Sequence, residues 1–216
     1  MKKTKYCSNE YEHEAWKKNM LVLGIDEAGR GPIAGPLCVA GVVFPKDYQN
    51  DEIYDSKAIS EKKRNALFEQ IQKDALAFKI RLISEKEIDE KNIYRATQDA
   101  MHAIAEELAC DLVLTDAMPL PLYHKHPVTA LIKGDQKSVS IAAASILAKV
   151  TRDRIMDDLD QKYPGYGLGK HKGYPTAEHL KALKTLGVLP IHRRSYRPVA
   201  EACQMQMMLD LGDEEC

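Results

Sequence analysis

Short apolar runs separated by polar turns dominate the first third of the chain. Residues 21–25 form one such run, which indicates a buried strand that ends at Asp26 and Glu27. A second apolar run covers residues 37–44, and apolar residues alternate with basic ones over residues 78–82. The pattern predicts three strands with short links, arranged as an antiparallel meander.

Helical spacing dominates the rest of the chain. Ser60 and Ser84 stand at expected N-cap positions, and Glu87 completes a capping box with Ser84. Apolar spacing and end signals predict helices over residues 60–74, 93–108, 138–161 and 176–187, and strands over residues 112–114 and 128–132. A meander followed by alternating strands and helices predicts an α/β fold with a central mixed sheet.

The composition is that of a folded protein. Of 216 residues, 44% are hydrophobic, and 31 Lys and Arg stand against 32 Asp and Glu, which excludes a chain disordered throughout. The five cysteines show no Cys-x-x-Cys spacing, which argues against a zinc ribbon or a disulfide framework. The N-terminus lacks the apolar segment of a signal peptide, and the apolar runs are too short to span a membrane. We expect a cytoplasmic protein.

Pattern and charge divide the chain into three segments. Residues 1–20 are polar without a clear period and are expected to form a loosely docked N-terminal arm, and residues 21–200 are expected to form one domain. Within that domain, residues 162–197 carry eight Lys and Arg against Glu178 alone, whereas residues 201–216 form a tail with five acids and no Lys or Arg. The neutral total therefore averages parts of opposite sign, and the basic segment suits contacts with phosphates.

Four carboxylates stand where an open sheet collects reactive groups. Asp26 and Glu27 end one apolar strand, Asp116 ends another, and Asp135 precedes a helix. Adjacent carboxylates repel each other unless a cation neutralises them. If these acids converge, their oxygen atoms would suit Mg²⁺ or Mn²⁺, and two such ions would support phosphodiester hydrolysis. A solvated strand end remains the alternative for the pair at residues 26 and 27.

A glycine-rich loop over residues 29–36 follows the first strand. It superficially resembles a dinucleotide-binding loop, but that motif must open a helix, and here an apolar strand follows. A nucleotide cofactor is therefore not expected. The glycines allow a ligand to approach the backbone closely, and Arg30 adds a cation suited to phosphate or sugar oxygens.

Several of these residues belong to motifs that occur in a recognisable order. The motifs are Gly24–Gly31, Asp55–Lys57, Thr115–Asp116, Lys133–Asp135, Ala143–Asp153 and His171–Thr176. Together they resemble the type 2 ribonuclease H family (ribonuclease HII) over residues 21–199. The resemblance implies a ribonuclease H-like fold with a mixed five-stranded sheet flanked by helices, and we expect a helical C-terminal extension.

The resemblance also implies an activity and its metal site. The family cleaves the RNA strand of RNA–DNA hybrids and cuts at single ribonucleotides embedded in duplex DNA, leaving 3′-hydroxyl and 5′-phosphate ends. Its four metal-binding and catalytic carboxylates match Asp26, Glu27, Asp116 and Asp135, which implies a two-metal site for Mg²⁺ or Mn²⁺.

Substrate-binding positions carry over in the same way. The junction-sensing Gly-Arg-Gly loop of the family matches Gly29, Arg30 and Gly31, and the tyrosine that stacks on the deoxyribose after the ribonucleotide matches Tyr174. Lys57 matches a lysine near the substrate backbone. Ala58 departs from the pattern, because relatives often have a second lysine there.

Two other interpretations of the sequence stay open. A type 3 ribonuclease H would usually carry an extra N-terminal domain and lack the Gly-Arg-Gly signature. A non-catalytic hybrid-binding module would have to tolerate four acids beside phosphates without metals.

The expected partners are an RNA–DNA hybrid and duplex DNA that contains ribonucleotides, with no membrane. Residues 206–209 faintly resemble a sliding-clamp-binding peptide, although Asp210 replaces the expected aromatic residue. A monomer is expected. His192 lacks the spacing of a metal ligand and is expected in a solvated loop.

Overall fold

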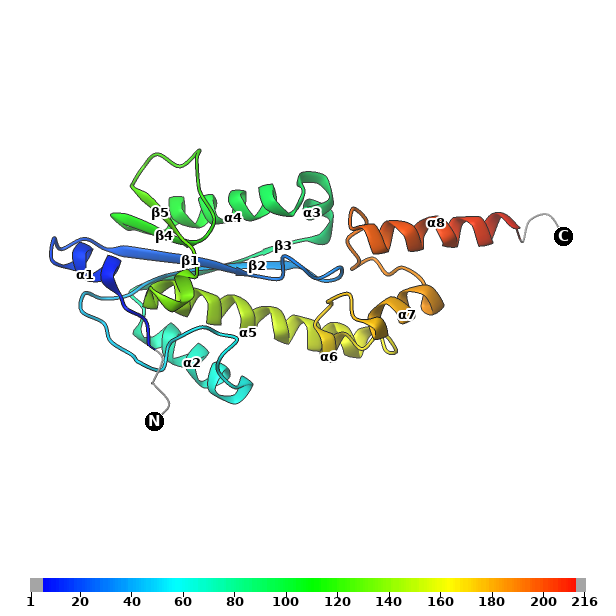
Figure 1. The fold of residues 1–216 in the computed structure, drawn as a ribbon, viewed down its shortest axis with the longest axis horizontal. Helices are drawn as coiled ribbons and strands as arrows, with labels where there is room; N and C mark the ends of the chain where they lie inside the picture. Colours follow the sequence, from blue (N-terminus) through cyan, green and yellow to red (C-terminus); the bar gives the residue numbers. More distant parts are fainter. Residues whose placement is uncertain (1–5, 213–216) are drawn as a thin grey trace. The chain divides into compact units, whose positions relative to one another are not determined.

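A computed structural model describes residues 6–212 of the chain, with side chains up to residue 206 (Figure 1). The chain folds into two compact units, whereas the sequence predicted one domain over residues 21–200. Unit 1 comprises the described part of Met1–Ala28, together with Cys38–Leu82 and Thr97–Thr151. Unit 2 comprises Gly29–Leu37, Ile83–Ala96 and the described part of Arg152–Cys216.

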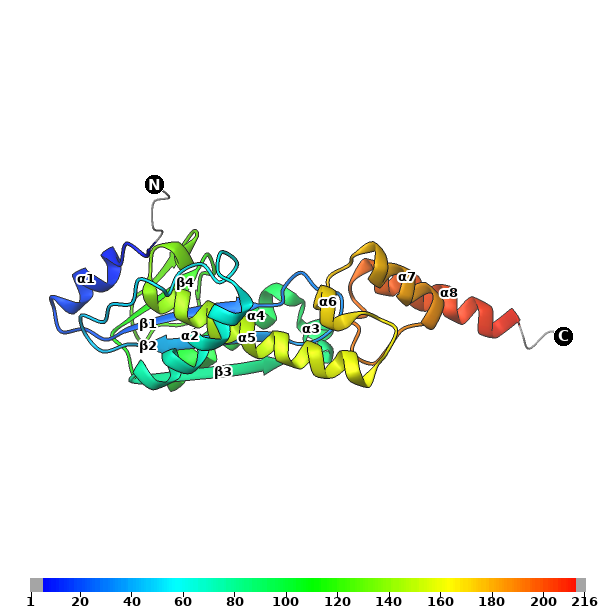
Figure 2. The same ribbon diagram turned by 90° about the horizontal axis from the view of Figure 1, so that it is seen from below.

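Unit 1 is built on a mixed five-stranded sheet in the order β3-β2-β1-β4-β5. The strands are β1 (Val22–Ala28), β2 (Leu37–Val43), β3 (Ala77–Ile83), β4 (Leu112–Asp116) and β5 (Val128–Leu131). The pairing of β1 with β2 is antiparallel, whereas β1 with β4 and β4 with β5 are parallel. Figure 2 shows β3 along the edge of the sheet, next to β2. The five-stranded mixed sheet is the predicted one.

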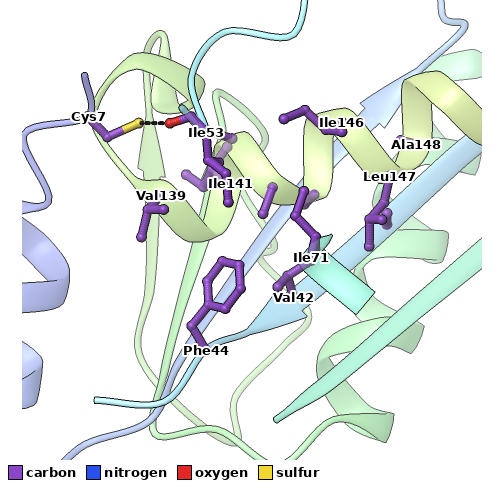
Figure 3. Close-up of a cluster of buried hydrophobic side chains, with 14 of the residues drawn as sticks. Cys7, Val42, Phe44, Ile53, Ile71, Val139, Ile141, Ile146, Leu147 and Ala148 are labelled. Atoms are coloured by element: carbon purple, nitrogen blue, oxygen red, sulfur yellow. Dashed lines mark hydrogen bonds between the residues drawn. The ribbon is translucent and has the colours of Figure 1, made fainter. Parts of the chain in front are cut away.

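Helices cover both faces of this sheet (Figure 1). On one face lie α2 (Glu61–Asp74) and α5 (Val139–Lys162), and on the other lies α4 (Ile93–Glu107), whose Ile104 contacts the Gly41 position. At Gly24 a Cβ atom would lie 2.2 Å from the Ser140 carbonyl carbon, so only glycine lets α5 begin this close to β1. The main core lies between β2, α2 and α5, and Figure 3 shows Phe44, Ile71 and Ile141 within it.

The N-terminal residues differ from the expected loose arm. Residues Glu10–Trp16 form helix α1, and the Trp16 side chain is only 2% exposed within the main core. Asn9 Oδ1 accepts a hydrogen bond from the backbone of Val139, and the buried Glu12 accepts from the Ser138 hydroxyl and from the Ser140 amide. The first backbone amides of a helix have no hydrogen-bond partner within that helix. Asn9 and Glu12, at the start of α1, supply such partners to the first amides of α5. The arm expectation is therefore wrong for this helix.

Unit 2 consists of short helices around two small cores. It contains α3 (Glu85–Lys91), the C-terminal part of α5, α6 (Leu168–His171), α7 (Ala177–Leu186) and α8 (Arg197–Gly212). One core gathers around Met156 and Tyr166, and the other around Ile33 and Val199. Helix α8 is the expected helical C-terminal extension; residues 213–216 of the acidic tail lie outside the described residues.

Most predicted element positions are confirmed. Three features differ from the prediction: the links of the meander, and the two unpredicted helices α1 and α6. The predicted caps form, because the Ser60, Ser84 and Thr176 hydroxyls each accept a hydrogen bond from the amide three residues ahead. The meander is wrong in its links, since α2 lies between β2 and β3. Helices α1 and α6 have seven and four residues, too short for a clear helical period.

Candidate active site

Asp26 and Asp116 lie on neighbouring parallel strands of unit 1. Ile25 of β1 pairs with Thr115 of β4, so the next residue on each strand is an aspartate on the same face of the sheet. Asp26 is only 5% exposed, and the amide of Glu27 donates to its Oδ1 at 2.7 Å. The amide of Gly134 donates to Asp116 Oδ1 at 2.8 Å. The sheet therefore brings the two predicted carboxylates together.

Asp135 is carried by a one-turn 3₁₀ helix, η1 (Gly134–Gln136). Its neighbour Gly134 holds Asp116 through the hydrogen bond just described, which links the two acidic segments. The Cys7 thiol lies 3.6 Å from the carbonyl oxygen of Asp135, and burial raises the pKa of that thiol to about 12. Cys7 is thus a neutral hydrogen-bonding group at this position. The charge of Asp116 acts on Asp135, so the structure places these two acids close enough to interact.

Glu27 differs from the other three acids. It follows Asp26 on β1, so the pleat directs the two side chains to opposite faces of the strand. Its charge still acts on Asp26 across this short separation. The structure therefore places Asp26 and Asp116 on one face of the sheet and Asp135 within electrostatic reach of Asp116, while Glu27 acts on Asp26 through its charge.

The electrostatics are those of a crowded anionic site. Burial raises the pKa of Asp26 well above its usual value, and the charges of Glu27 and Asp116 raise it further. Burial also raises the pKa of Asp135 to about 6, with added repulsion from Asp55 and Asp116. A cation beside these oxygens would remove the repulsion.

Two serines, Ser145 and Ser56, form a short hydrogen-bonded chain to Asp26. The Ser145 side chain hydrogen-bonds to Asp26, and its oxygen lies 3.0 Å from that of Ser56, in a buried contact. Neither serine was singled out from the sequence. The signal was the run of small residues at 141–145, which allows α5 to lie close to the sheet and bring a hydroxyl to the carboxylate.

Lys57 lies in a turn built by Asp55. Asp55 Oδ1 accepts a hydrogen bond from the amide of Lys57 at 2.9 Å, which makes Asp55 a turn residue. The other oxygen of Asp55, Oδ2, accepts from the side chain of Gln136, the neighbour of Asp135, at 3.3 Å. The positive charge of Lys57 opposes the rise in the pKa of Asp135. Lys57 therefore belongs to the electrostatic surroundings of the carboxylates.

The donor set fits a hard divalent cation. The donors are carboxylate oxygens, which Mg²⁺ and Mn²⁺ prefer, and their mutual repulsion is what a bound cation relieves. Within residues 6–212, no three Asp, Glu, His or Cys side chains are already arranged as a metal-binding cluster. The fit therefore rests on the chemistry and the shared location of the donors.

The predicted substrate loop belongs to unit 2. Gly29 has φ +105°, and a Cβ atom there would lie 2.2 Å from Nε of Arg152, so both its conformation and its surroundings require glycine. At Gly31 a Cβ atom would lie 3.2 Å from the ring of Tyr174, which is 45% exposed. The structure thus brings together Gly31 and Tyr174, two residues separated by more than half of the chain.

Two buried arginines hold this loop from inside. Arg193 donates to the carbonyl oxygens of Gly29 at 2.7 Å, Arg30 at 3.2 Å and Gly35 at 2.9 Å. Arg152 donates to the carbonyls of Pro36 at 2.9 Å, Ala34 at 3.0 Å and Lys172 at 2.8 Å.

These arginines fix the loop backbone rather than binding solvent or substrate, and the sequence analysis missed that role. No sequence signal marks this role, because their carbonyl partners at Ala34 and Gly29 lie more than 100 residues away. Arg30, in contrast to these two arginines, is an exposed residue.

Comparison with known proteins assigns the chain to a family. The model of the ribonuclease HII family matches residues 23–199. The chain belongs to the ribonuclease HII family. It is an endoribonuclease of the class that cleaves the RNA of RNA–DNA hybrids and ribonucleotides in DNA. The match to this family favours the type 2 interpretation over type 3, and an enzyme over a non-catalytic binding module.

Individual relatives agree with this assignment. A ribonuclease HII from Enterococcus faecalis is 48% identical over 196 residues, which cover 89% of this chain and 76% of the relative. The crystal structure of ribonuclease H2 from Pyrococcus horikoshii has a TM-score of 0.74 at 28% identity and covers 86% of this chain and 98% of that one. A complex of PCNA and ribonuclease HII from Archaeoglobus fulgidus gives a TM-score of 0.71 at 28% identity, with coverage of 82% and 95%.

None of the helices in residues 6–212 is long and apolar enough to cross a membrane. Within the same residues, Cys7, Cys38, Cys110 and Cys203 are free thiols.

Proposed function

We propose that Asp26, Asp116 and Asp135 hold divalent metal ions, Mg²⁺ or Mn²⁺, for hydrolysis of the phosphodiester at a ribonucleotide, and that the adjacent Glu27 adds its negative charge to this metal site. The observation that supports this is that the charge of Asp116 raises the pKa of both Asp26 and Asp135, in addition to the effect of burial. Two such ions, when bound, supply an activated water and stabilise the leaving oxygen. The products are a 3′-hydroxyl and a 5′-phosphate.

The protein groups around the carboxylates keep them in place for this task. Ser145 and the amide of Glu27 hydrogen-bond to Asp26, and the amide of Gly134 fixes one oxygen of Asp116, which leaves its other oxygen for a metal. Lys57 supplies a positive charge near Asp135 that suits a substrate phosphate.

Unit 2 supplies the groups that read the substrate. The Gly29–Arg30–Gly31 backbone recognises the 2′-hydroxyl, the one group that distinguishes a ribonucleotide from its deoxy counterpart. The exposed ring of Tyr174 stacks on the deoxyribose that follows, where a 2′-hydroxyl would intrude. The exposed basic residues over 162–197, but not the buried Arg193, bind the phosphates of the duplex.

Partners and cellular location form a separate part of the proposal. The archaeal complex with PCNA is a precedent for a protein partner in this family. In this chain the clamp-like segment at residues 206–209 begins at Gln206 of α8, and the side chains of residues 207–209 lie outside the described residues, so clamp binding stays a prediction. We also propose a monomer in the cytoplasm, consistent with the free cysteines of the described residues.

The metal assignment is tested with Asp116→Asn and a matched control. The variant keeps the Gly134 hydrogen bond through its side-chain oxygen but loses a charge, so we expect about a hundredfold or greater loss of Mg²⁺-dependent cleavage of a single-ribonucleotide duplex, with the fold intact. Asp111→Asn is the control, because Asp111 lies just before β4 at its other end and accepts a hydrogen bond from Leu21. Near-normal turnover of Asp116→Asn would contradict the carboxylate assignment.

A further inference from the structure

Three histidines of unit 2 lie against one another beside Tyr174. His179 and His192 are 0% and 2% exposed, and His171 is 9% exposed. The rings of His171 and His179 are stacked, with centroids 4.4 Å apart. His192 is therefore not in a solvated loop, as the sequence analysis expected, because it is enclosed by the core that contains Tyr166.

The hydrogen bonds fix which nitrogen of each ring carries the proton. The amide of Leu189 donates to His192 Nδ1 at 2.9 Å, so this nitrogen has no proton, and the proton of the neutral ring is on Nε2. His192 Nε2 lies 3.1 Å from His179 Nε2 and must donate to it. The proton of His179 is then on Nδ1, which lies 2.9 Å from the carbonyl oxygen of Tyr174. Two hydrogen bonds thus form a chain in which His192 donates to His179 and His179 donates to the backbone carbonyl of Tyr174.

Burial is consistent with neutral rings. Burial and, to a lesser extent, the charge of His179 lower the pKa of His192 to about 4. Burial also lowers the pKa of His179. The groups facing the pair are the backbone of Tyr174, the amide of Leu189, the ring of Tyr166 and the ring of His171, whose charge further lowers the pKa of His179.

The receiving end of this chain is a substrate-facing segment. The Tyr174 carbonyl accepts from His179 and from the amide of Thr176 at 2.8 Å, while the Tyr174 amide donates to His171 at 3.0 Å. One residue earlier, the Gly173 carbonyl accepts from the amide of Ile33 at 2.9 Å, which ties this segment to the glycine-rich loop. The backbone of Tyr174 is thereby fixed on both sides while its ring is left 45% exposed.

We propose that His192 and His179 are positioning residues that hold the Tyr174 backbone so that its ring stacks on the deoxyribose after the ribonucleotide. The inference rests on the proposed substrate role of Tyr174 and adds the groups that preset it. His192 acts only through His179, because it touches neither Tyr174 nor the substrate-facing surface through any of these bonds. Its chemical contribution is a single N–H donor that selects the Nδ1–H form of His179.

The test compares His192→Leu with His192→Gln. Leucine removes the donor, whereas glutamine places an amide N–H near the position of Nε2. We expect His192→Leu to lower kcat/KM on a duplex with one ribonucleotide about fivefold, the scale of one lost hydrogen bond, with a smaller loss of about twofold on a continuous hybrid. We expect His192→Gln to regain most of the single-ribonucleotide activity.

Two further variants separate the possible failures. Tyr166→Phe keeps the ring beside His192 but removes a hydroxyl that donates to Leu186 and Gly187 and not to the histidines, so it should lower both activities equally if at all. Tyr174→Ala should show the larger loss on the single-ribonucleotide duplex. If it does not, the proposed role of Tyr174 fails. If it does, but His192→Leu behaves like Tyr166→Phe, the positioning inference fails.

A spectroscopic measurement keeps the inference testable if His192→Leu does not fold. The ¹⁵N shifts of the His179 ring distinguish the two neutral forms, and we expect the Nδ1–H form in the wild-type protein and in His192→Gln. Observation of the Nε2–H form of His179 in the wild-type protein would overturn the proposal.

Discussion

In unit 1 the buried charges of the proposed site are carboxylates that repel one another, whereas unit 2 buries arginines that are surrounded by carbonyl oxygens. Asp26 and Asp135 both have raised pKa values, in part because other acids lie near them. Arg193 is 0% exposed, yet its guanidinium donates to three backbone carbonyls. The first arrangement is relieved by a ligand, and the second is already satisfied by the protein. A site that must bind a cation and a loop that must keep its shape therefore use buried charge in opposite ways.

The largest expected effect tests the satisfied charge of unit 2. Arg193→Ala leaves the buried carbonyls of Gly29 and Gly35 without their guanidinium donor and should destabilise unit 2 by about 4 kcal/mol. Native-state hydrogen exchange of the α7 amides measures unit 2, while the fluorescence of Trp16, the single tryptophan of the chain, reports on unit 1. Arg194→Ala, at an exposed neighbouring residue, is the control. Equal exchange in both variants would show that the arginine does not support the loop.

The second prediction concerns acid pH and gives the two units opposite responses. His192 has a pKa of about 4 in the folded protein and about 6.5 when unfolded, so below pH 6.5 the unfolded state binds the extra proton. Unit 2 should therefore lose about 3 kcal/mol of stability as the pH falls from 6.5 to 4. In unit 1 the raised pKa of Asp135 has the opposite sign, because the folded state takes up a proton first, and without metal this acid adds stability as the pH falls through 6.

Urea unfolding at several pH values, followed by Trp16 fluorescence and by exchange at α7, measures both responses. His192→Gln should flatten the acid dependence of unit 2 and leave that of unit 1 unchanged. Parallel pH profiles for the two probes would contradict the comparison between the units.

The smallest expected effect tests the repulsion in unit 1. Asp135→Asn removes one like charge, so in the presence of a chelator it should stabilise the protein by about 1 kcal/mol, a value reduced because Asp135 is partly exposed. The urea midpoint by Trp16 fluorescence measures this change. Adding Mg²⁺ should reverse the order, because the wild-type protein then gains binding energy that the variant lacks. A variant less stable than wild type in chelator would show that the acids do not repel one another.

Sequence patterns predicted the parts of the fold that rest on local rules. The Ser60 and Ser84 caps and the strand ending at Asp116 follow from residue type and spacing, and all three are present. The shared location of Asp26 and Asp116 was also predictable, because parallel strands end at one edge of a sheet.

The missed features depend on contacts between residues far apart in the chain. Arg152 and Arg193 bind carbonyls more than 100 residues away, and a basic residue in a sequence carries no sign of a backbone partner. His192 was expected in solvent because burial of a lone histidine depends on the residues packed around it. The Ser145 contact with Asp26 likewise required knowledge of how closely α5 approaches β1.

The capping of α5 by α1 has a consequence for the order of events during synthesis. Asn9 and Glu12 leave the ribosome early, but their partners at Val139 and Ser138 are 130 and 126 residues further along the chain. At a usual translation rate, the N-terminal segment must wait about 6 to 25 s for these partners. During that interval Trp16 and the other apolar side chains of the segment have no α5 to pack on. The segment that carries Asp135 is then completed by residues made more than 120 positions earlier, so the acidic site is among the last parts of unit 1 to form.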